Sequence, residues 1–177
     1  CADHYKFSRE QQDEYALASL ERALKAIENG HFRNEIVPVD VSTGSIDTDE
    51  QPGKARPEKI PALKPAFRKD GTVTAASSSS ISDGAAALVL MRRSEAERRG
   101  LKPLAVIHGH AGHAQAPAWF TTAPVGAIQK LLEKLDWRAG DVDLYEINEA
   151  FAVVAMAAMR DLDLPHAKLN VHGGACA

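Results

Sequence analysis

The nine residues LYEINEAFA, at positions 144–152, determine how the rest of this 177-residue chain can be interpreted. The mostly apolar run over residues 142–147 predicts a short strand, and the alanine-rich run after it predicts a buried helix over residues 149–162. Asn148 would stand at the N-terminus of that helix, where free N–H groups and partial positive charge gather. An asparagine there most often caps the helix, but its amide can also hold a water or donate to an oxyanion.

The composition narrows the class of protein. Hydrophobic residues make up 45% of the chain and charged residues 25%, which suits a soluble domain with a real core. The net charge of −3 gives no reason to expect nucleic acid, and no apolar run or signal peptide indicates a membrane. Two distant cysteines form no disulfide framework. We expect a cytoplasmic protein, and the missing initiator Met suggests an internal fragment or the ordered part of a longer chain.

The chain before this stretch begins with a helix signal. Ser8 and Gln11 form a capping box, and Gly30 could end the helix. Residues 35–41 predict a strand that Pro38 confines to an edge or a bulge. Residues 42–61 show almost no periodicity, which indicates an ordered excursion or a mobile loop. The apolar face of the helix is expected to carry Leu17, Leu20, Leu24 and Ile27.

A basic run follows, and it allows two interpretations. A solvated charged loop is the commoner case, whereas Arg and Lys can also bind the phosphates of a large anionic ligand. The run consists of Lys54, Arg56, Lys59, Lys64, Arg68 and Lys69, interrupted by Glu58.

Serines at positions 77–80 lie between predicted strands, which argues against a flexible linker. Small hydroxyl residues there would let a ligand approach the backbone closely. Further strands are predicted at residues 85–91, 104–110 and 168–172, with helices at 94–100, where Ser94 begins a capping box, and at 123–135. This alternation predicts an α/β fold with a mixed sheet between helices.

Other candidate sites are weaker. His108 and His110 would share one face of a strand and, with His113, could bind a metal, but no carboxylate or cysteine neighbours them, so we predict no metal site. Cys176 follows a double glycine and could be a nucleophile, although a small buried cysteine is commoner. His172 could be catalytic, yet no nearby residue supplies a partner.

Four separated segments together resemble the thiolase family, and within it the acetyl-CoA acetyltransferases. They are residues 8–19, 71–84, 148–152 and 170–174, in family order. The resemblance implies a partial thiolase-like layered α/β/α fold, with mixed sheets between helices. On this map residues 1–70 are the later part of an inserted, CoA-binding loop domain. Residues 71–100 end the N-terminal half, and residues 101–177 begin the C-terminal half.

The resemblance also implies residue roles. Asn148 matches an asparagine that holds a water in one of two oxyanion holes. Phe67, Phe151, Ser79 and Ala75 match residues along the pantetheine channel. Arg56 and Lys59 fall where the family places cations near the CoA nucleotide. Residues 76–78 depart from the family pattern of Gly or Ala, then Asn, then Ala, which puts the hydrogen bonds of that loop in question.

The family mechanism is a two-step acyl transfer between acyl-CoA substrates, with no covalently bound cofactor. The nucleophilic cysteine would lie before Cys1, and the catalytic histidine and second cysteine would lie after Ala177. Neither Cys1 nor Cys176 matches a catalytic cysteine, so these 177 residues alone are predicted to be inactive. Family analogy implies a homo-oligomer, a dimer or a tetramer, and a place in fatty acid metabolism.

Three alternatives stay open. A degradative 3-ketoacyl-CoA thiolase acting on longer substrates is the nearest. A non-catalytic CoA-binding relative would keep the binding wall and lack the nucleophile. A plain structural α/β domain would leave the four segments unexplained.

Overall fold

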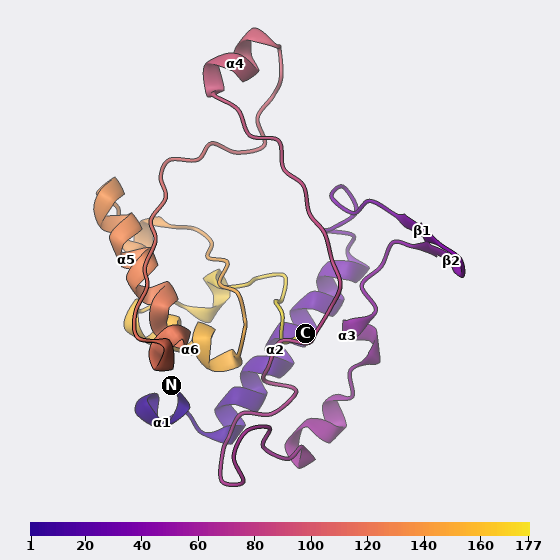
Figure 1. Cartoon of the computed structure of the whole chain (residues 1–177), viewed down its shortest axis with the longest axis vertical. Helices are drawn as coiled ribbons and strands as arrows, with labels where there is room; N and C mark the ends of the chain where they lie inside the picture. The colour runs from indigo at the N-terminus through magenta and orange to yellow at the C-terminus, as the bar shows by residue number, and fades with distance from the viewer.

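The computed structural model describes residues 1–177, and its centre is the long helix α2 (Arg9–Glu28). Helix α6 (Ala152–Asp161) packs against α2 on one side and against α5 (Ala123–Leu135) on the other (Figure 1). The shorter helices are α1 (Ala2–Tyr5), α3 (Gln51–Lys54) and α4 (Arg93–Arg98). Four 3-10 turns complete the set: η1 (Pro57–Ala62), η2 (Pro117–Thr122), η3 (Ala139–Asp141) and η4 (His166–Lys168). None of the helices combines the length and the apolar composition needed to cross a membrane.

Helix α2 begins at the predicted capping box. The Gln11 N–H donates to Ser8 Oγ at 3.2 Å, and the Ser8 N–H donates to Gln11 Oε1 at 2.9 Å. The helix ends at Glu28, and Gly30 then turns the chain with a left-handed φ of 69°. Such a φ strains residues that carry a Cβ, so glycine suits this position.

The predicted apolar face of α2 was wrong in its position. Of the four residues expected there only Leu20 is buried, and Leu24 is 42% exposed. The buried face carries mostly small or polar side chains, because the chain around Gly173 lies directly against the helix. A Cβ on Gly173 would lie 2.5 Å from the Ser19 carbonyl oxygen and 2.8 Å from the Ala23 Cβ. The close approach of this backbone requires small residues on α2, and a pattern of leucines at helical spacing does not identify them. The buried residues are Gln12, Asp13, Tyr15, Ala16, Ser19, Leu20, Ala23 and Ala26.

Helix α6 is buried as predicted, but it begins three residues later than expected. Residues 152–158 are all buried, and they form much of the core with Tyr15, Tyr145 and Leu169. The helix starts at Ala152 because Phe151 is extended, with φ −146° and ψ 152°, and forms a bridge to Ser78. Asn148 therefore does not lie at the helix N-terminus, and it does not cap α6.

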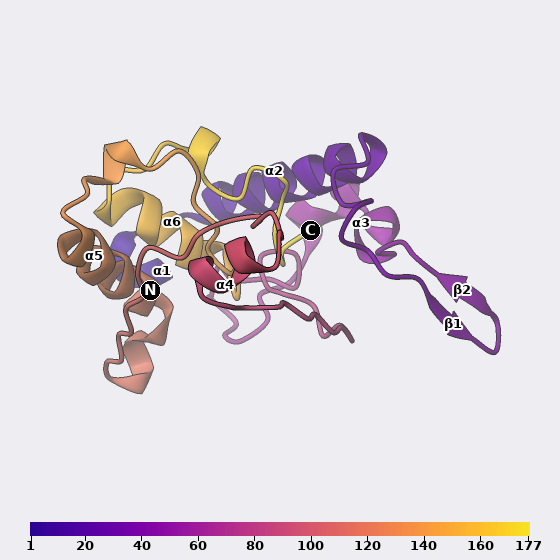
Figure 2. The ribbon, with the colours of Figure 1, turned by 90° about the horizontal axis from the view of Figure 1, so that it is seen from above.

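Most of the predicted strands are extended but unpaired. The only sheet is the exposed hairpin of β1 (Val39–Val41) and β2 (Gly44–Ile46), in which Val39 faces Ile46 (Figure 2). Residues 142–147 and 168–172 do lie side by side, and a single parallel bridge joins Tyr145 to Leu169.

Residues 85–91 and 104–110 form no strand, and they run through the wide open loop that carries α4 (Figure 1). Their apolar side chains, such as Leu88 and Ile107, are exposed. An extended segment becomes a strand only when a neighbour satisfies its backbone groups, and no neighbour for these segments lies within the chain. The predicted mixed sheet is therefore not formed by these residues.

The observed bounds of two further helices can be compared with the predicted ones. Helix α5 has both predicted bounds, and Asp136, with a left-handed φ of 54°, follows its last residue as the C-cap. Helix α4 begins at Arg93 with Arg92 as its N-cap, so the predicted capping box at Ser94 does not form. The excursion after the first predicted strand is ordered into β2, α3 and η1.

The contact between Gly173 and α2 leads to a first prediction. Gly173→Ala should destabilise the protein by about 2–4 kcal/mol, because the new Cβ meets the Ser19 carbonyl oxygen and the backbone φ is 81°. Gly112→Ala is the matched control, since nothing lies within 4 Å of its Cβ, and should change stability by less than about 0.5 kcal/mol. Urea unfolding measures both free energies. Equal values for the two variants would contradict the packing described.

Candidate functional site

The serine-rich loop and the segment before α6 are joined backbone to backbone. The Ser79 N–H donates to the Ala150 carbonyl at 3.2 Å, and the Ala152 N–H donates to the Ser77 carbonyl at 2.9 Å. Ser78 and Phe151 form an antiparallel bridge between these two bonds. We call this junction, residues 77–79 with residues 150–152, the seam. It places Ser79 beside Phe151, as the expected ligand channel requires.

Of the four serines at positions 77–80, Ser79 alone has a hydroxyl without a hydrogen bond; Ser80 bonds to Ser82, and Ser77 and Ser78 bond within the loop. Ser77 Oγ accepts from the Thr74 N–H at 2.9 Å, and the Ser78 hydroxyl donates to the Thr74 carbonyl at 2.6 Å. Ser77 is buried, whereas Ser79 is exposed and its hydroxyl has no hydrogen bond within the chain. The departure from the family pattern at residues 76–78 thus leaves a self-supporting turn that presents the Ser79 hydroxyl to solvent.

A cluster of three phenylalanines lies on one side of the seam. The Phe67 and Phe151 rings are 5.7 Å apart at 81°, and the Phe120 ring is 6.3 Å from Phe151 at 63°. All three line a cavity of about 340 Å³. Thr121 lines it too, and its buried hydroxyl has no partner. Sequence analysis expected Phe67 and Phe151 here and missed Phe120, for which the adjacent aromatics of η2 were the available signal.

Three of the six basic residues, Lys54, Arg56 and Lys59, line a second cavity of about 330 Å³ on the other side of the seam. Arg56 and Lys59 lie there with Ala75 and Ser78. The Arg56 guanidinium donates only to the carbonyls of Lys54 and Ala55, and Lys59 has no ion pair. In contrast, the Lys54 ammonium pairs with Glu50 and the Arg68 guanidinium with Asp3. The cavity therefore has two exposed cations available for an anion.

Asn148, like Ser79, lines neither of the two cavities. Its side chain is exposed and makes no hydrogen bond within the chain, although its neighbours Ile147 and Glu149 are buried. A free amide on a fixed backbone can donate to an external oxygen or hold a water.

Sequence analysis missed Glu149, whose carboxylate is 1% exposed. Tyr15 and Ser19 are one helical turn apart on the buried face of α2, and both hydroxyls donate to this carboxylate, but no local sequence signal connects them with Glu149. The burial of Tyr15 and its contact with the Glu149 carboxylate raise the Tyr15 pKa far above its ordinary range. Four donors contact the carboxylate: the Tyr15 hydroxyl at 2.7 Å, the Ser19 hydroxyl at 2.7 Å, the Asn170 amide at 2.8 Å and the Cys176 N–H at 3.0 Å.

The surroundings of Cys176 and of His172 do not match those of a catalytic cysteine and a catalytic histidine. Burial, with the Glu149 carboxylate nearby, raises the pKa of the Cys176 thiol to about 12, which makes it a poor nucleophile near neutral pH. His172 is exposed, and its ring lies 4.5 Å from that of His31. No group of three His, Cys, Asp or Glu side chains is arranged to hold a metal ion.

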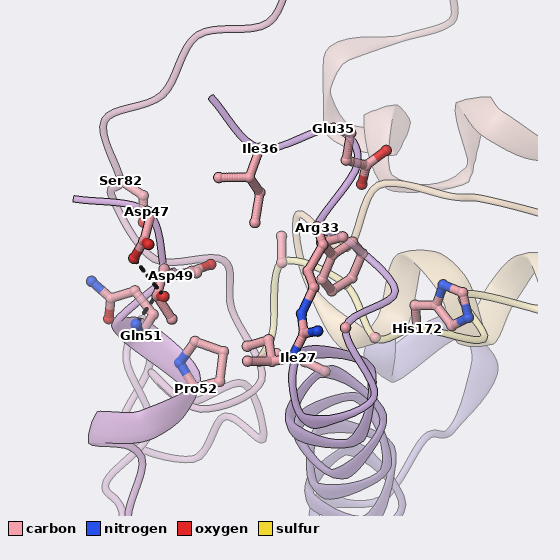
Figure 3. A pocket seen from close by; sticks show the side chains of 18 of the residues that line it. Ile27, Arg33, Glu35, Ile36, Asp47, Asp49, Gln51, Pro52, Ser82 and His172 are labelled. Atoms are coloured by element: carbon pink, nitrogen blue, oxygen red, sulfur yellow. Dashed lines mark hydrogen bonds between the residues drawn. The ribbon is translucent and has the colours of Figure 1, made fainter. Parts of the chain in front are cut away.

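A third cavity, of about 830 Å³ and larger than the two beside the seam, lies at the end of α2 (Figure 3). Arg33, Asp49 and His172 are among its lining residues, but none of the predicted site residues is. It adjoins the second cavity, because both are lined by Gln51, Ser80, Ala175 and Ala177. We place the candidate site at the seam, where predicted residues from three segments converge.

Comparisons with known proteins agree on one family. Residues 1–94 match the family model described as the thiolase N-terminal domain, and residues 101–177 match that of the thiolase C-terminal domain. A probable acetyl-CoA acetyltransferase of Dictyostelium discoideum is 50% identical over 182 residues, covering 100% of this chain. Acetyl-CoA acetyltransferase 1 of Arabidopsis thaliana is also 50% identical, over 99% of this chain. The chain spans 44% of the length of each of these relatives.

Solved structures give the same result. The Acat5 thiolase of Ascaris suum, crystallised in complex with coenzyme A, superposes with a TM-score of 0.96 at 42% identity, over 99% of this chain and 46% of its own. The acetyl-CoA acetyltransferase of Bacillus anthracis gives a TM-score of 0.93 at 45% identity, over the same shares of the two chains.

The surroundings of Cys176 predict slow thiol chemistry. Its pKa is raised from 9.0 to about 12, so at pH 8 the thiolate fraction, and with it the rate of alkylation by iodoacetamide, should be about 1000-fold lower in the folded protein than in urea. The folded state holds this proton more tightly than the unfolded state. The resulting stabilisation is therefore complete below about pH 9 and is lost as the pH rises toward 12. Mass spectrometry of the peptide containing residue 176 measures the rate. Equal rates in the folded protein and in urea would contradict this environment.

Proposed function

Because the chain belongs to the thiolase family, we propose that it is part of an acetyl-CoA C-acetyltransferase, which condenses two acetyl-CoA molecules or cleaves a 3-ketoacyl-CoA with coenzyme A. The observation that carries the proposal is the seam, with free cations in the cavity on one side and aromatic rings in the cavity on the other. The relatives' names and the coenzyme A complex of the Ascaris suum thiolase support it.

In this proposal coenzyme A lies across the seam as a substrate. Its phosphates are anionic, and Arg56 and Lys59 offer charge that no carboxylate neutralises. The pantetheine arm is largely apolar with two amides. The rings of Phe67 and Phe151 would cover its apolar part, and the free Ser79 hydroxyl would hydrogen-bond one amide, with Ala75 on the same loop.

Asn148 would act at the reacting end of the substrate. Its free amide would stabilise the negative charge that develops on a thioester oxygen, either directly or through a water. The covalent steps, transfer of the acyl group to a cysteine thiolate and attack by the acetyl-CoA carbanion, would use residues outside these 177. The raised pKa of Cys176 supports this division, because that thiol is not a competent nucleophile.

The remaining expectations rest on family analogy. We propose a cytoplasmic location and a homo-oligomeric assembly, a dimer or a tetramer, for the whole protein. The domain boundaries near residues 70 and 100 stay predictions.

Thiolysis of acetoacetyl-CoA by the whole protein tests the function and the role of Asn148. Asn148→Ala should lower kcat by about 10²–10³-fold while leaving the melting temperature unchanged, because an exposed side chain with no internal hydrogen bond adds little to stability. A wild-type protein without thiolysis activity would overturn the proposed function. An active protein whose kcat is unaffected by Asn148→Ala would overturn only the role of Asn148.

The two free cations are tested by substrate affinity. The double variant Arg56→Ala, Lys59→Ala should raise the KM for coenzyme A about tenfold and weaken its dependence on salt, since two phosphate contacts are lost. The KM for a pantetheine thioester without the nucleotide should not change. Lys25→Ala is the control, because Lys25 is exposed, pairs with Glu21 and lines neither cavity beside the seam. An equal rise in KM for coenzyme A and for the pantetheine thioester would contradict a nucleotide contact.

A further inference from the structure

Glu149 carries a buried charge that neutral donors hold without an ion pair. Its four donors come from three separate places: Tyr15 and Ser19 on α2, Asn170, and the backbone of Cys176. A buried carboxylate is costly unless its oxygens are hydrogen-bonded, so all these groups are held close to it. Gly174 leaves room for the carboxylate, since a Cβ there would lie 2.5 Å from the Glu149 Cδ.

Asn170 extends this network to the residue before Asn148. Its amide donates to the Ile147 carbonyl at 2.8 Å, and its Oδ1 accepts from the Ile147 N–H at 2.8 Å. The same amide donates to Glu149 Oε1. Asn170 has a left-handed φ of 45°, a conformation that asparagine adopts more readily than most residues. The backbone before Asn148 is therefore fixed through both of its polar groups.

The residue after Glu149 is held by the seam, where the Ala150 carbonyl accepts from Ser79. Ile147, Glu149 and Ala150 are thus each bonded to another segment, and the Asn148 side chain between them makes no hydrogen bond of its own. This is the arrangement of a donor that is aimed outward by its neighbours.

From this geometry we infer that Glu149 is a positioning residue: its carboxylate, gripped by Tyr15, Ser19 and Asn170, fixes the direction in which the Asn148 amide points. The inference rests on the proposed function, because it explains what holds the proposed oxyanion donor in place. A glutamine could not replace Glu149, since its NH₂ group would face the Cys176 N–H or the Tyr15 and Asn170 donors. Displacing a catalytic group by a fraction of its working distance lowers the rate strongly, so the effect should appear in kcat.

The test removes one hydrogen-bond donor of Glu149 and compares the effect on kcat with the effect of removing a tyrosine hydroxyl elsewhere in the protein. Tyr15→Phe takes a hydroxyl from Glu149, and Tyr145→Phe takes the hydroxyl of a second buried tyrosine from the Ala139 carbonyl, 2.9 Å away. Steady-state thiolysis by the whole protein should show kcat about tenfold lower for Tyr15→Phe, with KM within about twofold of wild type. Tyr145→Phe should lower the melting temperature by a similar amount without changing kcat. Should Tyr15→Phe fail to fold, Ser19→Ala removes another donor of the same carboxylate.

A double variant separates positioning from a general loss of structure. In the Asn148→Ala background, Tyr15→Phe should lower kcat no further, because the group that it positions is gone. Equal kcat for Tyr15→Phe and wild type, or fully additive losses with Asn148→Ala, would overturn the inference and leave the proposed function standing. An inactive wild-type protein would overturn the proposed function, and this inference with it.

Discussion

The carboxylate of Glu149 lies in the protein interior with four hydrogen-bond donors around it and no ion pair. Much of the local structure follows from keeping that charge satisfied. Helix α2 must present Tyr15 and Ser19 on its buried face, which leaves little room there for leucine. The chain at Gly173 and Gly174 must pass between α2 and the carboxylate, where any side chain would collide. Helix α6 begins three residues after Glu149, beyond the segment that this network and the seam hold in place.

The seam then divides the candidate site by chemistry. The cations without an ion pair line one cavity, and the phenylalanines line the other, where the only cationic side chain, Arg68, pairs with Asp3. Ser79 and Asn148 each offer a polar group that the chain itself does not use. This division suits a long ligand with an anionic head and a less polar arm. No residue of the site is an activated nucleophile, because the Cys176 thiol is held protonated by its surroundings. In the proposed function the chain would supply walls and hydrogen-bond donors, and other residues would supply the covalent groups.

The sequence predicted the elements with strong local signals. The capping box located the start of α2, helix α5 had both expected bounds, and the burial of α6 followed from its alanines. The partial thiolase-like α/β fold is confirmed by the structural superpositions. The strands at residues 85–91 and 104–110 failed because pairing depends on neighbours, which a pattern within one segment cannot supply. Glu149 was missed because its donors are distant in sequence, and only the fold brings them together.

A crystal structure of the whole protein with coenzyme A tests the central claim most directly. The account predicts the pantetheine arm along the seam, against Phe67, Phe151 and the Ser79 hydroxyl, with the phosphates within ion-pair distance of Arg56 and Lys59. It also predicts the sulfur end of the ligand on the side of Asn148. Coenzyme A bound instead in the large cavity beside Arg33 and His172, with the seam empty, would contradict it.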